Sequence, residues 1–451
     1  MRFGLLALLP LAISSASFSV SAQTLQEAMQ QAVTEHPEVH AAVNRRLAAD
    51  SGLRAAQGGY LPKVDVLAGY GREGTDNPSS RAEAGSNDWN TLSRGESTVR
   101  LSQMLFDGFA TSSEVGRNKA TVNSRAYALL NTSERTALTV AQVYLEVLTR
   151  QELVRLAQDN LDSHERIHDQ IRLRTDRGVG RIADLNQAEA RLAQARNNLI
   201  TEQTNLVDAQ TNFYSAVGAD AVDLQQPSTG VQLPDTLAQA RQQMIENSPV
   251  LRSAEADIAA AEQQYNAAKS AFYPRFDAEL GRSANNDIDG QDGHYNEWEA
   301  MVRMRYNLYS GGSDKATLEA RSYQAGEALD IRNNALRQLN EELGLAWNAL
   351  TNARTQLPIA QKYVDETSEV RAAYQKQFGL GERTLLDLLD SENELFSAQR
   401  RLAEIKLAEQ YTQYRLQATL GTLLKTQGVV APMETVVQNE VKPKIALPGL
   451  N

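Results

Sequence analysis

The chain has 451 residues, a formal net charge of -11 and no cysteine. Without cysteine it cannot form disulfides, a thiolate metal site, a c-type haem attachment or the acylated cysteine of a lipoprotein. The acidic balance without a basic tract argues against a nucleic-acid partner. Aromatic residues make up only 6% of the chain while alanine, glutamine and asparagine abound, which is typical of long helices packed through small side chains.

Residues 1–22 have the three parts of a secretory signal peptide. Arg2 supplies the positive charge, residues 3–13 form the apolar stretch, and Val20-Ser21-Ala22 is a small-residue cleavage site. The apolar stretch is too short for the ~20 residues of a membrane-spanning helix. The sequence therefore predicts an exported chain that begins near Gln23.

One long unit occurs twice in this chain. Residues 24–218 recur in order as residues 236–421, first at an offset of 212 and then, after a loop that changes length, at an offset of 203. Tyr60-Leu61-Pro62 thus matches Phe272-Tyr273-Pro274, and Gly178 matches Gly381. We expect a first repeat over 23–218, a linker over 219–235, a second repeat over 236–421 and a loosely packed tail over 422–451.

Each repeat is predicted to begin with helix, over 25–57 and 237–270, and to continue with a strand hairpin. Pro62 and Pro274 end the helices because the residue before proline avoids the α region. Alternating sequence follows, so that Val302 and Met304 share one face while Arg303 lies on the other. The predicted hairpins cover 63–106 and 275–309, with strands of about 9–10 residues, which suits a tilted strand crossing a bilayer.

Two interpretations of these hairpins remain open: membrane-spanning strands, or half-buried hairpins in a soluble domain. Four strands cannot close a barrel, because even small closed barrels use about eight strands. If the strands cross a membrane, several chains must share one barrel.

A long helical hairpin is predicted to follow each strand hairpin. Between Gly108 and Gly178 there is no proline, so a helix of about 100 Å is possible, whereas Pro358 predicts a kink or break in the second copy. The returning arms, over 185–216 and 388–419, carry apolar or small residues at alternating steps of three and four, which predicts a coiled-coil seam. The turns between arms contain two pairs of glycines: Gly178 and Gly180, and Gly379 and Gly381.

No constellation in the sequence supports catalysis. The segment from His164 to His168 matches H-E-x-x-H, the zinc-binding pattern of metalloproteases. Its counterpart in the second repeat has no histidine, and the remaining histidines, His36, His40 and His294, lie far away in sequence. We therefore expect an ordinary helix face, no enzyme activity, no metal and no cofactor.

Charged residues follow the two helical turns. Asp387 and Asp390 are three residues apart and so share a helix face, Arg383 lies one turn before Asp387, and Asp184 takes the matching place in the first repeat. Such charges are usually a solvated face. In a closed oligomer they would instead repeat around the axis, and carboxylate rings select cations in pores.

Together these features resemble the TolC family of outer-membrane channel proteins, from about Thr24 to Gly421. The residues that carry the resemblance are Tyr60-Leu61-Pro62, Tyr273-Pro274, Leu308-Tyr309-Ser310-Gly311-Gly312, and the two helical turns with Asp184 and the run from Gly381 to Asp390. The resemblance implies an α+β membrane protein: a homotrimer in the outer membrane, whose twelve strands form one barrel continued by a periplasmic α-helical tunnel.

The resemblance also implies roles for residues near the turns. Asp184 and Arg383 match the links that close the periplasmic entrance, Asp387 and Asp390 match the constriction ring, and the turns with Gly178, Gly180, Gly379 and Gly381 match the tips where the adaptor docks. The tyrosine of the closing links falls at Phe378, which has no hydroxyl group.

Within the family, the sequence is most similar to the outer-membrane components of type I secretion systems, including the branch that exports large adhesins. This implies an inner-membrane ABC transporter, a periplasmic adaptor (membrane fusion) protein and an exported protein substrate as partners, with outer-membrane lipid around the barrel. Multidrug efflux is the alternative. A periplasmic adaptor or structural coiled coil is disfavoured because adaptors normally carry one helical hairpin per chain.

Overall fold

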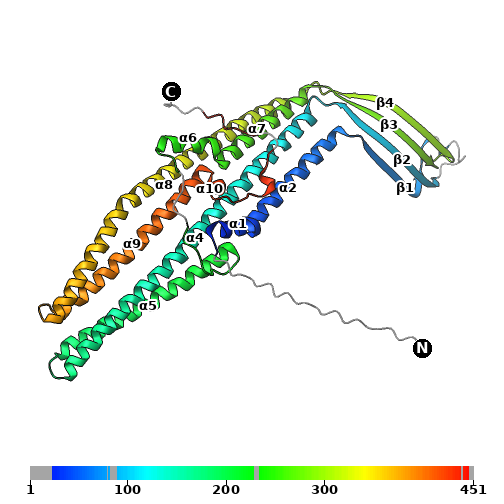
Figure 1. Cartoon of the computed structure of the whole chain (residues 1–451). Coiled ribbons are helices and arrows are strands. Elements are labelled where there is room, and N and C mark those ends of the chain that lie inside the picture. Colours follow the sequence, from blue (N-terminus) through cyan, green and yellow to red (C-terminus); the bar gives the residue numbers. More distant parts are fainter. Residues whose placement is uncertain (1–22, 79, 82–88, 228–232, 438–439, 446–451) are drawn as a thin grey trace, which may run out of the picture.

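The computed structural model describes residues 23–78, 80–81, 89–227, 233–437 and 440–445; the predicted signal peptide lies outside these ranges. It is an elongated molecule with a sheet at one end and two helical hairpins at the other (Figure 1). Within the described ranges, none of the helices combines the length and apolarity needed to cross a bilayer. The elements are α1 (Leu25–Glu35), α2 (Pro37–Gln57), η1 (Gly58–Tyr60), β1 (Lys63–Thr75), β2 (Asn90–Phe106), α4 (Ala110–Asp176), α5 (Ile182–Val217), α6 (Leu237–Asn247), α7 (Pro249–Ala268), η2 (Lys269–Phe272), β3 (Arg275–Asn286), β4 (His294–Arg305), α8 (Ser313–Leu380), α9 (Leu385–Leu420), α10 (Leu423–Thr426) and η3 (Met433–Thr435).

The four strands form one antiparallel sheet in the order β1-β2-β3-β4. The first predicted hairpin, 63–106, has the observed outer bounds, and the strands are longer than expected at 12 to 17 residues. The second hairpin was predicted to reach residue 309, which is wrong because β4 ends at Arg305. Beyond it the Asn307 side chain accepts the backbone N–H of Tyr309, and Gly311 and Gly312 adopt positive φ before α8 begins. These turn contacts compete with the strand ladder.

The two faces of the sheet differ in polarity, as the alternation predicts. On one face Val66 and Val302 are 72% and 64% exposed in the single chain. On the other face Asp277 accepts hydrogen bonds from Arg275 and Arg305, and Glu279 pairs with Arg303. The face with exposed apolar side chains suits contact with lipid, and the face with paired charges suits an aqueous bore.

Each repeat contains one very long helix. α4 has 67 residues and α8 has 68, so each is about 100 Å long. A kink or a break was expected at Pro358, and the break is wrong because α8 continues through this residue. Pro358 is exposed, so the carbonyl that it leaves without an N–H donor can be hydrated.

The returning helices α5 and α9 pack along the predicted seams. Every predicted seam position from Leu185 to Ala216 and from Leu388 to Thr419 is buried or half-buried. Glu202 is the charged exception in α5, and it is only 3% exposed. Arg150 of α4 and Arg400 of α9 lie 3.5 Å from its carboxylate, so the buried charge is paired and joins three helices.

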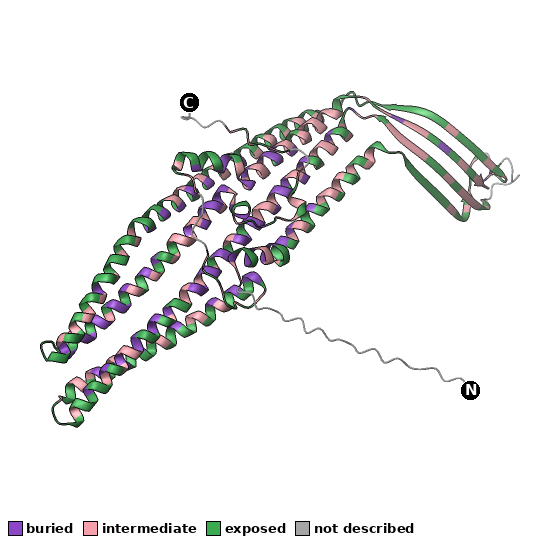
Figure 2. Cartoon of the chain, in the orientation of Figure 1, coloured by how far each residue is buried: buried purple, intermediate pink, exposed green. Residues whose placement is uncertain are grey.

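The largest cores lie near the middle of the long axis, where short helices cover the long ones. α1 packs its buried residues against α4, and α6 packs against α8 and α9. Figure 2 shows burial concentrated there, while both hairpin ends and the sheet are largely exposed. The single chain therefore leaves much of its long-helix surface uncovered.

The prediction of a loosely packed tail is wrong for most of its described part. Leu423 is fully buried, and Val430 exchanges two hydrogen bonds with the Gln30 side chain of α1. Further on, the N–H of Val441 donates to Tyr127 of α4, and Ile445 packs against the core between α6, α8 and α9. Backbone N–H groups that satisfy side chains far away in sequence cannot be recognised from composition. Residues 438–439 and 446–451 lie outside the described part.

Candidate functional site at the helical tips

The two helical hairpins end in different turns. Residues 177–181 join α4 to α5, with Gly178 at φ +76°. A Cβ atom at Gly180 would lie 2.7 Å from the backbone nitrogen of Thr175, so only glycine fits there. In the second turn Gly381, at φ +81°, caps α8, while Gly379 lies inside its last turn, so the prediction that it belongs to the turn is wrong. A helical conformation suits any residue at 379, and only Gly381 needs the left-handed region.

Within one chain Asp184 and Arg383 are not joined by any contact of the described residues. Asp184 lies in the first turn of α5. Arg383 donates to the Gln377 side chain at 3.0 Å, stacks over the Tyr374 ring at 4.2 Å and lies 3.8 Å from Asp387. The Arg383 guanidinium is therefore held by residues of its own hairpin.

The two aspartates of the predicted ring have different partners. The Asp387 carboxylate accepts the Thr384 N–H, and the Asp387 N–H donates to the Thr384 hydroxyl oxygen, which together form a capping box at the start of α9. The carboxylate also accepts the Thr384 hydroxyl at 2.8 Å. Asp390 accepts a hydrogen bond from Arg191 of α5 at 2.8 Å. Arg191 thus joins the two hairpins of one chain directly. It was absent from the predicted site, because its partner is 199 residues away in sequence.

Phe378 is buried in the core near the tips. It is 7% exposed and packs in a cluster with Ile171 of α4 and Leu389 of α9. The Arg174 guanidinium stacks over its ring at 5.1 Å. The phenyl ring therefore attaches α8 to α4 by burial and a cation–π contact, without a hydroxyl group. The aromatic ring that Arg383 stacks over is Tyr374.

A buried charged layer lies further from the tips, between α4, α8 and α9. Glu392 is 5% exposed, and Arg371 lies 3.8 Å from its carboxylate. Burial raises the pKa of Glu392, and the charges of Arg371, His164 and Arg166 oppose that rise. This layer connects the two hairpins of the chain above the tips.

The H-E-x-x-H segment belongs to this layer. The Nδ1 atom of His164 lies 2.9 Å from the carbonyl of Asn160, and His168 lies near Asp169 and Glu189. Across the described ranges no three histidine or acidic side chains are placed to hold a metal ion.

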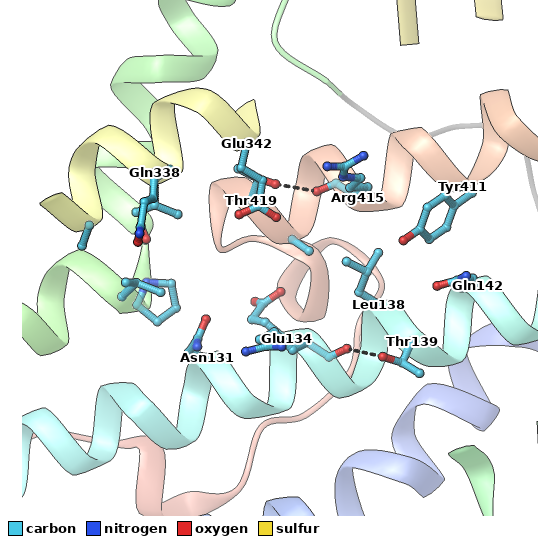
Figure 3. Close-up of a pocket in the computed structure, with 17 residues that line it drawn as sticks. Asn131, Glu134, Leu138, Thr139, Gln142, Gln338, Glu342, Tyr411, Arg415 and Thr419 are labelled. Atoms are coloured by element: carbon cyan, nitrogen blue, oxygen red, sulfur yellow. Dashed lines mark hydrogen bonds between the residues drawn. The ribbon is translucent and has the colours of Figure 1, made fainter. Parts of the chain in front are cut away.

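A polar cavity of about 570 Å³ lies where α7 and α9 meet between α4 and α8. Figure 3 shows Glu134 from α4, Glu342 from α8 and Arg415 from α9 around it. The Glu134 carboxylate also accepts the backbone N–H groups of Leu423 and Leu424. Burial raises the pKa of Glu134 to about 8, although these N–H groups lower it.

The sheet, the long helices and the tips define one class of protein. A four-stranded sheet with a lipid-suited face continues into two helical hairpins whose long helices, α4 and α8, each measure about 100 Å. This is the protomer of an outer-membrane channel with a large periplasmic part. Residues 28–219 and 240–422 match the family model described as outer membrane efflux protein, one match for each repeat. The chain therefore belongs to this family, the TolC family.

Similar proteins include channels named for both efflux and secretion. The chain is 24% identical to the outer membrane efflux protein BepC of Brucella suis, over 84% of this chain and 81% of BepC. It is 22% identical to the outer membrane protein TolC of Vibrio cholerae over 92% and 95% of the two chains. It is 25% identical to the proteases secretion protein PrtF of Dickeya chrysanthemi over 92% of each chain.

Solved structures show the same fold. The Campylobacter jejuni CmeC outer membrane channel superposes with a TM-score of 0.77 at 16% identity, over 88% of this chain and 86% of CmeC. The expected fold class is thereby confirmed: the fold is that of a trimeric channel in which a shared barrel continues into a helical tunnel. Channels of this family work with a periplasmic adaptor and an inner-membrane transporter, and they are not enzymes.

Proposed function

We propose that this channel is the exit duct of a type I secretion system. It would pass unfolded protein, including large adhesins, from an inner-membrane ABC transporter and its adaptor to the cell exterior. The observation that carries this proposal is the likeness to the proteases secretion protein PrtF over 92% of both chains. The chain also has no cysteine for a lipid anchor, which acylated drug-efflux relatives would carry.

Efflux of small molecules is the second candidate. It is favoured by the likeness to BepC, which is named an efflux protein, over 84% of this chain. Deletion of the gene separates the two candidates, with secreted proteins and drug susceptibility measured in the same strains. Loss of a secreted protein with unchanged drug tolerance supports secretion. Increased drug susceptibility with an unchanged set of secreted proteins would replace it with efflux.

We propose further that Asp184 and Arg383 close the periplasmic entrance by pairing between neighbouring chains. The support is their position beside the helical turns and the lack of a contact between them within one chain. Removing both partners removes the link that would hold neighbouring chains together in the closed state, which destabilises the closed state relative to the open one. Asp184→Ala with Arg383→Ser should therefore raise single-channel conductance in planar bilayers. Parental conductance would contradict this gate.

Asp387 and Asp390 are proposed as the constriction ring. The Asp387 side chain also accepts the Thr384 N–H in the capping box of α9, so asparagine is the suitable replacement because it retains an accepting oxygen. Asp387→Asn with Asp390→Asn should weaken cation selectivity and block by multivalent cations, with trimers still formed. Parental selectivity and block in this variant would place the constriction elsewhere.

The glycine turns are proposed as the adaptor-docking tips. Val179 and Leu380, beside the glycines, are 79% and 76% exposed, so each turn offers an apolar contact. Val179→Asp with Leu380→Asp should abolish co-purification with the adaptor and leave conductance unchanged. Undiminished co-purification would move the docking surface away from the tips.

A further inference from the structure

The internal repeat also specifies how one copy of the chain contacts the next. If the two repeats are related by the same rotation that relates neighbouring chains, each contact between repeats within a chain has an image between chains. The offsets of 212 before the strand hairpin and 203 after it convert one residue into its image.

Contacts inside the two repeats show that these offsets are correct in three dimensions. Leu129 of α4 packs in one apolar cluster with Val43 of α2. Their images are Arg332 and Glu255, which form a buried ion pair at 3.0 Å between α8 and α7. The chemistry differs completely, yet the same two positions meet, so the offsets describe geometry and not only sequence.

The polar cavity between the repeats has an incomplete image at the edge of the chain. A second hollow beside α4 is lined by residues of α2, α4 and α5. Nine of its residues are images of residues that line the complete cavity. In chain order, His36, Glu38, Thr132, Arg135, Thr136, Thr139, Asn212, Ser215 and Ala216 correspond to Ser248, Val250, Ala335, Gln338, Leu339, Glu342, Arg415, Ala418 and Thr419.

What the edge hollow lacks is the wall that α4 supplies to the complete cavity. Glu134, Leu138 and Gln142 belong to that wall. Their images on α8 are Arg337, Glu341 and Leu345, which are all exposed in the single chain. The residues of the missing wall therefore lie on the opposite edge of the same chain. A second copy would bring this edge against the hollow of the first.

We propose that α8 of a second copy of this chain closes the edge hollow, and that Arg337 of that copy pairs with Asp220. Glu134 contacts the backbone of Leu423 within the chain, and the images of these two residues are Arg337 and Asp220. Both image residues are exposed, and no ion pair of either is found among the described residues. Within one chain, the Glu134 carboxylate meets backbone N–H groups. At the matching place between two chains, two side chains of opposite charge meet instead.

An apolar contact accompanies the ion pair nearer to the tips. Leu156 of α4 and Ala403 of α9 belong to one cluster within the chain. Their images, Ile359 and Ile200, are 66% and 61% exposed in the single chain. These two exposed isoleucines on opposite edges are the partners of the same contact between chains.

Disulfide cross-linking tests the proposal directly, because the chain has no cysteine of its own. Ile200→Cys with Ile359→Cys, oxidised in outer membranes, should give covalent trimers on a non-reducing denaturing gel. Gln361 lies two residues after Ile359 and so about 200° around α8. Ile200→Cys with Gln361→Cys is therefore the matched control and should stay monomeric on the gel.

Trimer mass in detergent is measured in parallel, so that assembly and register are separated. Assembled trimers with no Ile200–Ile359 cross-link, or with equal cross-linking through Gln361, would overturn the proposed register. A charge exchange tests the ion pair: Asp220→Arg should lower the thermal stability of the trimer, and adding Arg337→Asp should restore it. Failure of the exchange to restore stability would overturn the pairing. None of these results depends on which substrate the channel carries.

Discussion

Replacing Arg191 with alanine should favour the open state of the channel. Arg191 of α5 donates to Asp390 of α9 at 2.8 Å, and this ion pair joins the two helical hairpins of one chain near the tips. If the entrance widens because one hairpin moves away from the other, the Arg191–Asp390 ion pair has to break. If the two hairpins keep their relative positions, the ion pair stays intact during opening.

The structure sets the size of the effect. The side chains of Arg191 and Asp390 are 29% and 57% exposed, so the pair is screened by water and should contribute about 0.5–1 kcal/mol. Three chains that open together lose three such pairs, or about 1.5–3 kcal/mol. The ratio of open to closed channels should then rise by roughly 10-fold to 100-fold, at about 1.4 kcal/mol for each factor of ten.

Single-channel recording in planar bilayers measures this ratio as the fraction of time spent at high conductance. Arg196→Ala is the matched control, because Arg196 pairs with Glu165 at 3.3 Å within one hairpin. That variant loses an exposed ion pair without loosening the two hairpins from each other. The reasoning is refuted if Arg191→Ala and Arg196→Ala have the same open fraction as the parent, or if both raise it equally.

Three further predictions concern the sheet, Glu134 in the polar cavity and the end of α9. Ala300 lies mid-strand on the lipid-suited face of β4, so Ala300→Arg should cost ~2–4 kcal/mol of stability and reduce the amount of assembled trimer on gels. Met304 lies one residue from the strand end, so Met304→Arg should cost only ~0–1 kcal/mol. Equal losses of trimer would contradict the placement of Ala300 deeper in the bilayer than Met304. Burial raises the pKa of Glu134 from its ordinary 4.5 to about 8 in the folded chain. The stability that this carboxyl group contributes is therefore complete below pH 4.5 and is lost as the pH rises through 8, by about 1.4 kcal/mol for each pH unit. Melting temperatures from pH 5 to 9 should therefore fall less in Glu134→Gln than in the parent, and parallel curves would show that Glu134 does not titrate in this range. Gly421 has φ +71° and a Cβ there would lie 2.7 Å from a Pro249 carbon, so Gly421→Ala should destabilise the chain by about 1–3 kcal/mol in thermal unfolding; an unchanged melting temperature would argue against the strain.

The sequence predicted the parts of the fold that rest on local patterns. Period-two alternation placed the strand faces, and the three-four spacing identified the seams of α5 and α9, because both patterns describe how one element faces its neighbour. The duplication then placed two such units in one chain. Of the kink or break expected at Pro358, the break does not occur, since a proline on an exposed helix face removes one hydrogen bond that water can replace.

The site was predicted less completely, because its contacts join residues far apart in sequence. Nothing local distinguishes Arg191 from Arg196, the other arginine of α5, and only the approach of α9 makes Arg191 a partner of Asp390. The same holds for Phe378: its lack of a hydroxyl group was evident, but not its burial against α4. The tail was misjudged for this reason too, since Tyr127 accepts a backbone N–H from a residue 314 positions away.

The mass of the species extracted from outer membranes in mild detergent shows whether three chains share one barrel. A sheet of four strands leaves unpaired edges that only closure with other copies removes, so a folded chain should be found in threes. We expect the protein extracted from the outer-membrane fraction to have the native mass of three chains. A monomeric mass for protein that retains its full helical circular dichroism would contradict it.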